Sequence, residues 1–390
     1  VVGSSALQVT SPNLDRYNVG ALICGSNDEA HPVKFRADGC QFSGTQYGIT
    51  GNGLSHYTDI VLEDCLVGIG NGGVEYAVYH PQNGTIAIKN SEVRGYRAGI
   101  EIRAGELLVE NSEVVMVGTT MRGNAGWTFD STEFSNEPNG DGTTTSGAAI
   151  AISQHTTNLP IRVTVRGSHV VAGSGNALYG SGGQFESEDT NLYPAFYSIY
   201  EKDTVGDGDS DIDIAIESGL FQGNLYSENV TGFIEGGVFQ RVKSTLGEGE
   251  AVVNAAYLAA DVTQLTPETN TLAYVEIAPN DAVTVIREGE ETDYPTVRAA
   301  FESFGAEPVT ATVRFNHPMY YTGAKTQQTP IEGGSSAFTS VLATVYPGQD
   351  ITLDLNGQYI NFTNGSFETG SDCAFLNMGG TFTVKDSAGG

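Results

Sequence analysis

A short phrase recurs along this chain, and it constrains the fold more than any single residue does. Each copy has two or three alternating β-formers, a charged residue, an Asn, Asp or Gly, a small residue and a further apolar pair. The copies are VKFRADGCQF from Val33, IVLEDCLV from Ile60, IAIKNSEV from Ile86, LLVENSEV from Leu107, VTVRGSHV from Val163, IAIESGLF from Ile214, GFIEGGVF from Gly232 and FTVKDSAGG from Phe382. Such self-similarity indicates a repeat architecture.

The spacing of the copies predicts the kind of repeat. The residues before the small position are Gly39, Asp64, Asn90, Asn111, Gly167, Ser218 and Gly236. Successive steps are 25, 26, 21, 56, 51 and 18 residues, so two of them are close to double steps. A unit of ~20–26 residues with short strands and no helix is typical of one coil of a parallel β-helix, a solenoid whose coils stack at the strand spacing.

Each coil also carries a second apolar run after a glycine-bearing turn. These runs are residues 47–50, 76–79, 99–102, 149–152 and 177–179. Two or three strands per coil, separated by Gly- and Asn-rich turns, form a prism of parallel sheets. The small residues of the phrase are predicted to stack into one ladder at a tight corner: Cys40, Cys65, Ser91, Ser112 and Ser168.

Other repeat and all-β folds fit the pattern less well. A leucine-rich repeat shares the unit length but has a denser framework of Leu and Asn than this chain. A β-sandwich places strands about every 8–12 residues, without a fixed phrase at larger steps. The length of 390 residues exceeds that of a usual single domain, yet a solenoid grows in one dimension and need not divide.

The charge of the chain limits its partners. Asp and Glu number 47 against 18 Lys and Arg, which gives a formal net charge of -29. Such a surface repels nucleic acid and anionic membranes, so we expect neither as a partner. The sequence contains no run of 18 apolar residues, so we expect no membrane insertion. Repeat type and composition favour an extracellular or cell-surface location, and Val1 indicates a mature chain or a piece of a longer one.

The end of the chain differs from its start. After Phe239 the phrase stops, and the Ala-rich residues 247–260 predict a short helix or an irregular connector. Two β-runs, 272–277 and 282–286, are parted by a Pro-Asn-Asp turn and predict a hairpin. The clearest helix begins near Asp293, with Pro295 in its first turn and Gly305 at its stop.

An amphipathic helix ahead of a β-helix is well placed to cover the open end of the coils. Strand patterns resume after it at 310–315, 340–346, from Ile351 and from Phe382. We therefore expect a β-helix body at 1–258, a connector with a β-hairpin at 259–290, and a capping helix with the opening coils of a β-helix at 291–390.

This order of segments is permuted, because a cap and opening coils follow a body. Reading FTVKDSAGG into VVGSSALQVT continues the coil pattern. The hypothesis is that residues from about 289 to 390 are completed by residues 1–258 of another copy, which is either the next repeat of a longer polypeptide or the next subunit of a filament. A heterologous contact of this kind produces a fibre when it does not close. A boundary that simply cuts a tandem array is the alternative.

Four phrases carry a resemblance to a known family: DYPTVRAAF from Asp293, ITLDLNGQYI from Ile351, TFTVKDSAGG from Thr381 and IEGGVF from Ile234. They resemble the right-handed parallel β-helix, pectin-lyase-like modules of large bacterial surface and fibre proteins. The resemblance implies a right-handed coil and a surface, adhesive or fibre-forming role. The phrases stand in a rotated order here, in agreement with the permutation.

Enzymatic chemistry finds little support in the sequence. A polygalacturonase-like hydrolase needs paired Asp residues with a His and an Arg-Lys phrase, and its NTD, GHG and RIK phrases are absent. A pectate-lyase-like site needs calcium-binding carboxylates with a basic residue, and no basic residue recurs beside an acid at the coil spacing. We therefore expect no catalytic residues and no organic cofactor.

The strongest metal candidate is DTVGDGDSDID, in which Asp207, Asp209, Asp211 and Asp213 crowd one turn. Alternating carboxylates supply the hard oxygen ligands that Ca²⁺ prefers. The spacing does not match a helix-loop-helix calcium loop, and a solvated acidic turn is the alternative.

Two further sets of residues leave alternatives open. Cys40 and Cys65 lie one coil apart, within disulfide reach, or form a reduced pair of core residues, whereas Cys24 and Cys373 have no evident partners. Aromatic platforms for sugars are available at Trp127 and at several tyrosines, although stacked rings on a β-helix more often form packing ladders. The tyrosines concerned are Tyr47, Tyr57, Tyr76, Tyr79 and Tyr96.

The expected function is therefore that of a structural module in an extracellular fibre or filament, assembled head-to-tail with copies of itself. The alternatives are a carbohydrate-binding or polysaccharide-cleaving β-helix, whose partners are host or environmental glycans, and an adhesin with a protein receptor.

Overall fold

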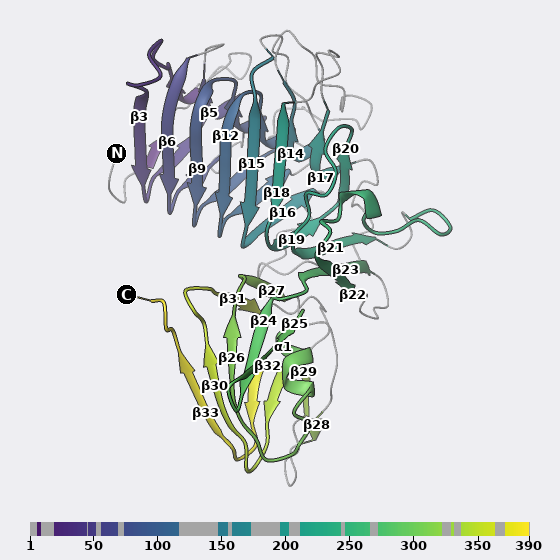
Figure 1. Ribbon diagram of the computed structural model, residues 1–390. Coiled ribbons are helices and arrows are strands. Elements are labelled where there is room, and N and C mark those ends of the chain that lie inside the picture. The colour runs from purple at the N-terminus through teal and green to yellow at the C-terminus, as the bar shows by residue number, and fades with distance from the viewer. Residues whose placement is uncertain are drawn as a thin grey trace.

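The molecule is built mainly from β-strands in parallel sheets (Figure 1). The computed structural model describes residues 6–8, 19–44, 46–51, 56–68, 74–116, 147–154, 158–172, 196–202, 211–242, 246–265, 272–321, 329–330, 337–362 and 371–389. Within these ranges, no helix has both the length and the apolar character that crossing a bilayer requires.

Three sheets form a stack in the N-terminal part, here called the N-terminal stack. Sheet A contains, in spatial order, β3 (Val33–Asp38), β6 (Tyr57–Glu63), β9 (Asn83–Lys89), β12 (Gly105–Glu110), β15 (Ile161–Arg166) and β18 (Ile212–Ile216). Sheet B contains β1 (Ala6–Gln8), β4 (Gln41–Ser43), β7 (Leu66–Val67), β10 (Glu92–Gly95), β13 (Glu113–Met116), β16 (Ser168–Ala172), β19 (Gly219–Gln222), β21 (Gly237–Val242), β23 (Leu272–Pro279) and β22 (Val262–Leu265). Sheet C contains β2 (Val19–Ile23), β5 (Tyr47–Gly51), β8 (Tyr76–His80), β11 (Ala98–Ile102), β14 (Ala148–Ile152), β17 (Tyr197–Glu201) and β20 (Asn224–Ser227).

The chain passes through these sheets in a repeating order. From β3 to β20, successive strands belong to sheets A, B and C in turn, and each pairs in parallel with the strand one cycle before it. In the six copies that begin between Val33 and Ile214, the phrase is the sheet A strand, its corner and the start of the sheet B strand. Four of the five predicted second runs are the sheet C strands β5, β8, β11 and β14, and the fifth, at 177–179, lies outside the described residues.

Inward and outward side chains alternate along the sheet A strands. In β12, Leu107 and Val109 are buried in the core, whereas Leu108 lies on the outer face and is partly exposed. Their neighbours in the register are also buried, since Val109 pairs with Ile88 on one side and with Val165 on the other. The period of two along a strand therefore builds one continuous apolar core through the stack.

The turn from sheet A to sheet B is tight because one residue adopts the left-handed conformation. Asp64, Asn90 and Asn111 have φ of 51°, 48° and 48°, and Gly39 and Gly167 take the same position. Asn, Asp and Gly are the residues that tolerate this region. This backbone requirement explains why one of these residues recurs in the phrase.

The predicted corner ladder of small residues is confirmed. Cys40, Cys65, Ser91, Ser112 and Ser168 are all buried and follow one another in the register. The Ser91 hydroxyl accepts from the Cys65 N–H at 3.0 Å, and the Ser112 hydroxyl accepts from the Ser91 N–H at 3.0 Å. The serines thus satisfy buried backbone donors at a corner that leaves no room for a larger side chain.

At the far end of the N-terminal stack, sheet B continues into antiparallel strands, whereas β18 and β20 are the last strands of sheets A and C. β23 pairs antiparallel with β21 and with β22, and the short helix η3 (Ala255–Tyr257) lies in the predicted Ala-rich connector. The predicted hairpin between 272–277 and 282–286 is wrong. β24 (Val283–Arg287) instead pairs with β25 and β26, because its apolar side chains join a separate core.

A second stack, the C-terminal stack, repeats the three-sheet arrangement on a smaller scale. Sheet D contains β25 (Glu290–Tyr294), β24, β26 (Thr310–Phe315), β30 (Asp350–Asp354) and β33 (Thr381–Lys385) in spatial order. Sheet E contains β27 (Met319–Tyr321) and β31 (Ile360–Phe362), and sheet F contains β28 (Thr329–Pro330), β29 (Ala337–Val345) and β32 (Ser371–Asn377). From β29 to β33 the chain visits sheets F, D, E, F and D, with parallel pairing between cycles.

The predicted capping helix exists but begins later than expected. Helix α1 spans Val297–Glu302, because the Thr296 hydroxyl accepts from the Ala299 N–H and so forms the N-cap. Asp293 belongs to β25, where it pairs with Thr284. The helix buries Val297, Ala300 and Phe301 in the core of the C-terminal stack.

The two stacks have separate hydrophobic cores. The core cluster of the N-terminal stack extends to Ile277, and that of the C-terminal stack begins at Ala282. The residues predicted as a connector, 259–290, are divided between them, since β22 and β23 complete sheet B whereas β24 belongs to sheet D.

The alternation in β12 yields a direct stability prediction. Leu107→Ala should lower the free energy of unfolding by about 2–5 kcal/mol, because it leaves a cavity in a buried site. Leu108→Ala, one residue away on the outer face, is the matched control and should cost less than about 1 kcal/mol. Urea unfolding followed by circular dichroism measures both, and equal effects would contradict the inward and outward assignment.

Candidate functional site

At one end of each stack, the outermost strand of every sheet pairs in parallel with its neighbour. At the start of the N-terminal stack, β1, β2 and β3 are the outermost strands of sheets B, C and A. At the end of the C-terminal stack, β31, β32 and β33 are the outermost strands of sheets E, F and D. Each of these six strands pairs with a described strand on one side only, so its other edge presents backbone donors and acceptors.

Apolar side chains are exposed at the same two ends. Among the described residues, the large apolar side chains that stand out as exposed are Leu22, Val33, Leu66 and Val384, and three of these four lie on β2, β3 and β33. Val384 is 55% exposed, although its register neighbour Leu353 is 1% exposed. Val384 thus occupies a core position that no strand of the described residues covers.

The edge strands also have a defined hydrogen-bonding phase. Leu355 N–H donates to the Lys385 carbonyl at 2.8 Å, so Lys385 turns its backbone groups toward β30. In a parallel strand the neighbouring residue turns the other way, so Val384 and Phe382 present theirs to the open edge. Gly39 N–H donates to the Glu63 carbonyl at 3.0 Å, so Gly39 faces β6 and Asp38, Arg36 and Lys34 face the open edge of β3.

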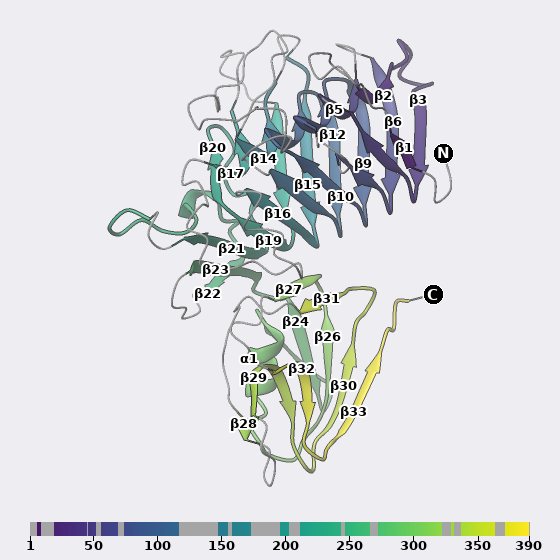
Figure 2. The ribbon, with the colours of Figure 1, turned by 180° about the vertical axis from the view of Figure 1, so that it is seen from behind.

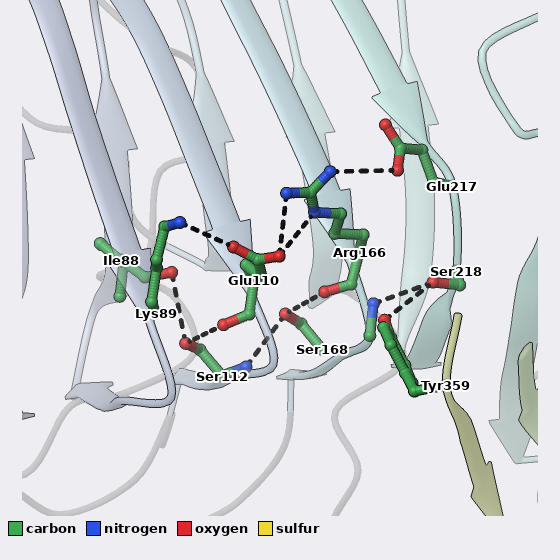
Figure 3. A network of polar contacts seen from close by, with 10 residues as sticks. Ile88, Lys89, Glu110, Ser112, Arg166, Ser168, Glu217, Ser218 and Tyr359 are labelled. Carbon is green, nitrogen blue, oxygen red and sulfur yellow. Dashed lines mark hydrogen bonds and ion pairs between the residues drawn. The ribbon is translucent and has the colours of Figure 1, made fainter. Parts of the chain in front are cut away.

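A ladder of ion pairs runs along the outer face of sheet A beside the small-residue corner (Figure 3). The Glu110 carboxylate lies 3.1 Å from Lys89 Nζ and 2.8 Å from the Arg166 guanidinium, and Arg166 also lies 3.9 Å from Glu217. Each exposed pair contributes little by itself. The pairing nevertheless favours one register of stacking, because a slip of two residues would place Glu110 opposite Ala87 or Thr164 and lose these ion pairs.

The two stacks meet at the end of this corner ladder. Figure 3 shows the Tyr359 ring of the C-terminal stack against Ser218, with its hydroxyl 3.4 Å from the Ser218 hydroxyl. The Ser218 hydroxyl also accepts from the Gly167 N–H at 2.9 Å. Burial raises the pKa of Tyr359, so its hydroxyl stays protonated and able to donate.

Gly167 leaves the space that Tyr359 occupies, because a Cβ atom at this position would overlap the Tyr359 hydroxyl. Gly167→Ala should therefore loosen the contact between the stacks and speed cleavage between residues 277 and 282 in limited proteolysis. Gly39→Ala is the matched control, since Gly39 has a similar φ of 61°. Both variants should lose about 1–2 kcal/mol of stability from the left-handed backbone, but only the first should change the cleavage rate. Equal rates would contradict this contact.

A half-buried glutamate lies on β23, within electrostatic range of Arg298 of the C-terminal stack. Glu276 in β23 is placed between Val238 of β21 and Leu265 of β22. Burial raises the pKa of Glu276 from 4.5 to about 7, and the positive charge of Arg298 on α1 opposes this rise. The carboxyl group is therefore more easily protonated in the folded chain than in the unfolded chain.

This shift predicts a dependence of stability on pH. The folded state binds the Glu276 proton more tightly, so stability should fall as pH rises from about 4.5 to about 7 and then level off. Glu276→Gln should raise the free energy of unfolding by about 1–3 kcal/mol at pH 8 and change it little at pH 4.5. Glu63→Gln, on an exposed position of β6, is the control and should behave alike at both pH values. A Glu276→Gln effect independent of pH would contradict the assignment.

The predicted calcium ligands are only partly within the described residues. Asp207 and Asp209 lie outside them, whereas Asp211 and Asp213 are exposed at the start of β18. The described ranges contain no group of three or more His, Cys, Asp or Glu side chains that could hold a metal ion. The calcium site therefore stays a prediction.

The predicted tyrosines of sheet C are brought together, but largely against one another. Tyr47 lies 5.7 Å from both Tyr76 and Tyr79, measured between ring centroids. Farther along the sheet, Tyr200 and Tyr226 stack at 5.1 Å. Tyr76 and Tyr79 are 5% and 9% exposed, so their rings serve packing more than solvent contact. Trp127 lies outside the described residues.

A buried polar cluster at the C-terminal end of strand β11, in sheet C, was not predicted from the sequence. Glu101 and Arg103 are fully buried and form an ion pair at 3.5 Å, and Arg103 also donates to the Gln154 carbonyl at 3.1 Å. Burial lowers the pKa of nearby His80 to about 4, so this imidazole is neutral at pH 7. The available signal was the run GIEIRAG, in which charged residues interrupt an apolar strand.

The cysteines of the corner ladder are reduced. Cys40 and Cys65 are both buried thiols, and each donates to a backbone carbonyl two residues before it, at 3.2 and 3.1 Å. Burial raises the pKa of Cys65, which disfavours the reactive thiolate. These thiols therefore act in packing.

No protein-family model, no curated protein and no solved structure matches this chain.

Proposed function

We propose that this chain is a structural module of an extracellular, cell-surface fibre, in which right-handed parallel β-helices continue one another head-to-tail. The observation that carries the proposal is the pair of complementary open ends. Three outermost strands at one end, β1, β2 and β3, have counterparts in β31, β32 and β33 at the other.

The chemistry of the ends supports joining. An open strand edge carries backbone groups that a further parallel strand satisfies, which is why natural proteins usually cover such edges. Val384 and Leu22, which are 55% and 56% exposed, add apolar area whose burial is favourable. Repulsion between chains that carry a net charge of -29 works against nonspecific association and leaves the matched ends as the favoured contact.

The positions of β3 and β33 in the molecule limit the shapes that an assembly of copies can take. β3 and β33 are outermost on the same side of the molecule in both views, at the left in Figure 1 and at the right in Figure 2. A head-to-tail contact repeats into a filament unless its rotation closes. Two copies that join at both pairs of ends would form a closed dimer. The experiment must therefore distinguish this dimer from a fibre.

Carbohydrate binding is a second candidate, and the tyrosine clusters on sheet C favour it. Tyr197, Tyr200 and Tyr226 form one cluster, and Tyr47, Tyr76 and Tyr79 form the other. Their mutual packing leaves less ring surface for a sugar than an open platform provides, so the structural role is preferred. Binding of soluble plant and bacterial polysaccharides, measured by affinity electrophoresis, tests this second candidate.

Blocking one end should stop assembly. Val384→Asp places a charge at the exposed core position of β33 and should keep the chain monomeric at concentrations where the unchanged chain forms larger species. Thr383→Asp, the neighbouring exposed position on the outer face, adds the same charge and should leave assembly intact. Mass photometry and electron microscopy across concentration measure both. Monomers of the unchanged chain at every concentration contradict the proposal, and discrete closed pairs contradict the fibre.

A further inference from the structure

We infer that the partner of β3 is β33 of a second copy, in one particular register: Phe382 opposite Phe35, Val384 opposite Ala37, and Lys385 opposite Asp38. This inference rests on the proposed function and identifies the strands and side chains of the joint.

The inward and outward alternation of the two strands agrees in this register. Phe35 packs against Phe42 at 5.9 Å and Ala37 is buried, so both face the core of the N-terminal stack. Phe382 packs against Phe375 at 5.2 Å and against the core of the C-terminal stack, and Val384 lies on the same face because it pairs with buried Leu353. Pairing Phe382 with Phe35 and Val384 with Ala37 therefore makes one continuous core, and a slip of one residue would turn both apolar side chains outward.

The directions of the backbone N–H and C=O groups on β33 and β3 also agree with this register. In the observed sheets, Asp354 is paired with Lys385, and Asp38 is paired with Glu63. In each pair, the N–H of the residue after the first member, Leu355 or Gly39, donates to the carbonyl of the second member. In the new rung, Lys385 pairs with Asp38 and the following N–H, that of Asp386, donates to the Asp38 carbonyl. The backbone groups of Val384 and Arg36 face each other across the joint, as the observed phase of each strand requires.

Registers that differ by two residues all keep the inward and outward alternation, and the charges on the two strands favour one of them. Lys385 forms an ion pair with Asp354 at 3.1 Å and would stand between Asp354 and Asp38, as Glu110 stands between Lys89 and Arg166. A slip of two residues in one direction places Lys385 opposite Arg36, which are like charges. A slip of two residues in the other direction places Phe35 opposite Gly380, outside β33, and leaves it uncovered.

Asp354 fixes the turn after β33. Asp354 accepts from the Ser387 N–H at 2.9 Å and pairs with Lys385. Burial by itself raises the pKa of Asp354, but hydrogen bonds from Ser387, Lys385 and Asn356 outweigh it and lower the pKa. In the inferred register Ser387 lies opposite Cys40, so the small-residue ladder continues across the joint.

Cysteine trapping tests the register. One chain carries Thr383→Cys and another carries Arg36→Cys, both in a background with Cys24→Ser and Cys373→Ser, and the two are mixed under mild oxidation. Both positions are exposed, and circular dichroism verifies that the variants fold. Opposed residues on adjacent strands lie ~5 Å apart, within disulfide reach.

Lys34→Cys and Asp38→Cys are the matched controls, since they lie on the same face of β3 two residues away, at ~8 Å from the partner. Cross-linking of Thr383→Cys with Arg36→Cys should be at least about tenfold faster than with either control, whether the particles are filaments or closed pairs. A faster cross-link to a control overturns the register. Assembly without any of these cross-links overturns the β3–β33 contact while leaving assembly intact, and absence of assembly overturns both proposals.

Discussion

Lateral hydrogen bonding between parallel strands of successive cycles is the interaction on which the rest of the structure depends. From β3 to β20, every sheet of the N-terminal stack grows by one strand per cycle, and the one- or two-residue corner after each sheet A strand keeps the cycles aligned. The left-handed residue at that corner and the buried serine after it make the alignment strict, because the serine hydroxyl accepts the N–H of the neighbouring rung. Core packing and the ion-pair ladder then follow from the register that these bonds impose.

The same interaction explains why the ends matter. A stack that grows by adding strands always has an unsatisfied strand at the growing edge, so it must end in a cap or in another stack. This chain places antiparallel strands at one end of each stack: β23 and β22 continue sheet B, and β25 and β24, which contact α1, begin sheet D. The opposite ends keep parallel edges and exposed apolar residues, which is the arrangement expected of surfaces that join.

Much of the fold was predictable because its signals are local. The phrase combines the period of two that makes a strand, the Asn, Asp or Gly that the corner requires, and the small residue that the corner accommodates. The errors arose where distant parts of the chain decide. Residues 272–277 and 282–286 have the pattern of a hairpin, but they pair with different sheets because their apolar faces belong to different cores. The helix begins after Thr296 because β24 recruits residues 290–294 as a strand.

The ends that form the candidate site were likewise predictable only in part from the sequence. The sequence by itself determined the repeat, the corner ladder of Cys40 to Ser168, and the similarity between the last copy of the phrase at Phe382 and the first at Val33. Only the tertiary structure decided that β3 and β33 are open edges, that Val384 is exposed while Leu353 is buried, and that Lys385 is aligned with Asp354. The physical reason is that strand periodicity and turn conformation are properties of neighbouring residues, whereas edge exposure depends on which distant strands are present to cover it.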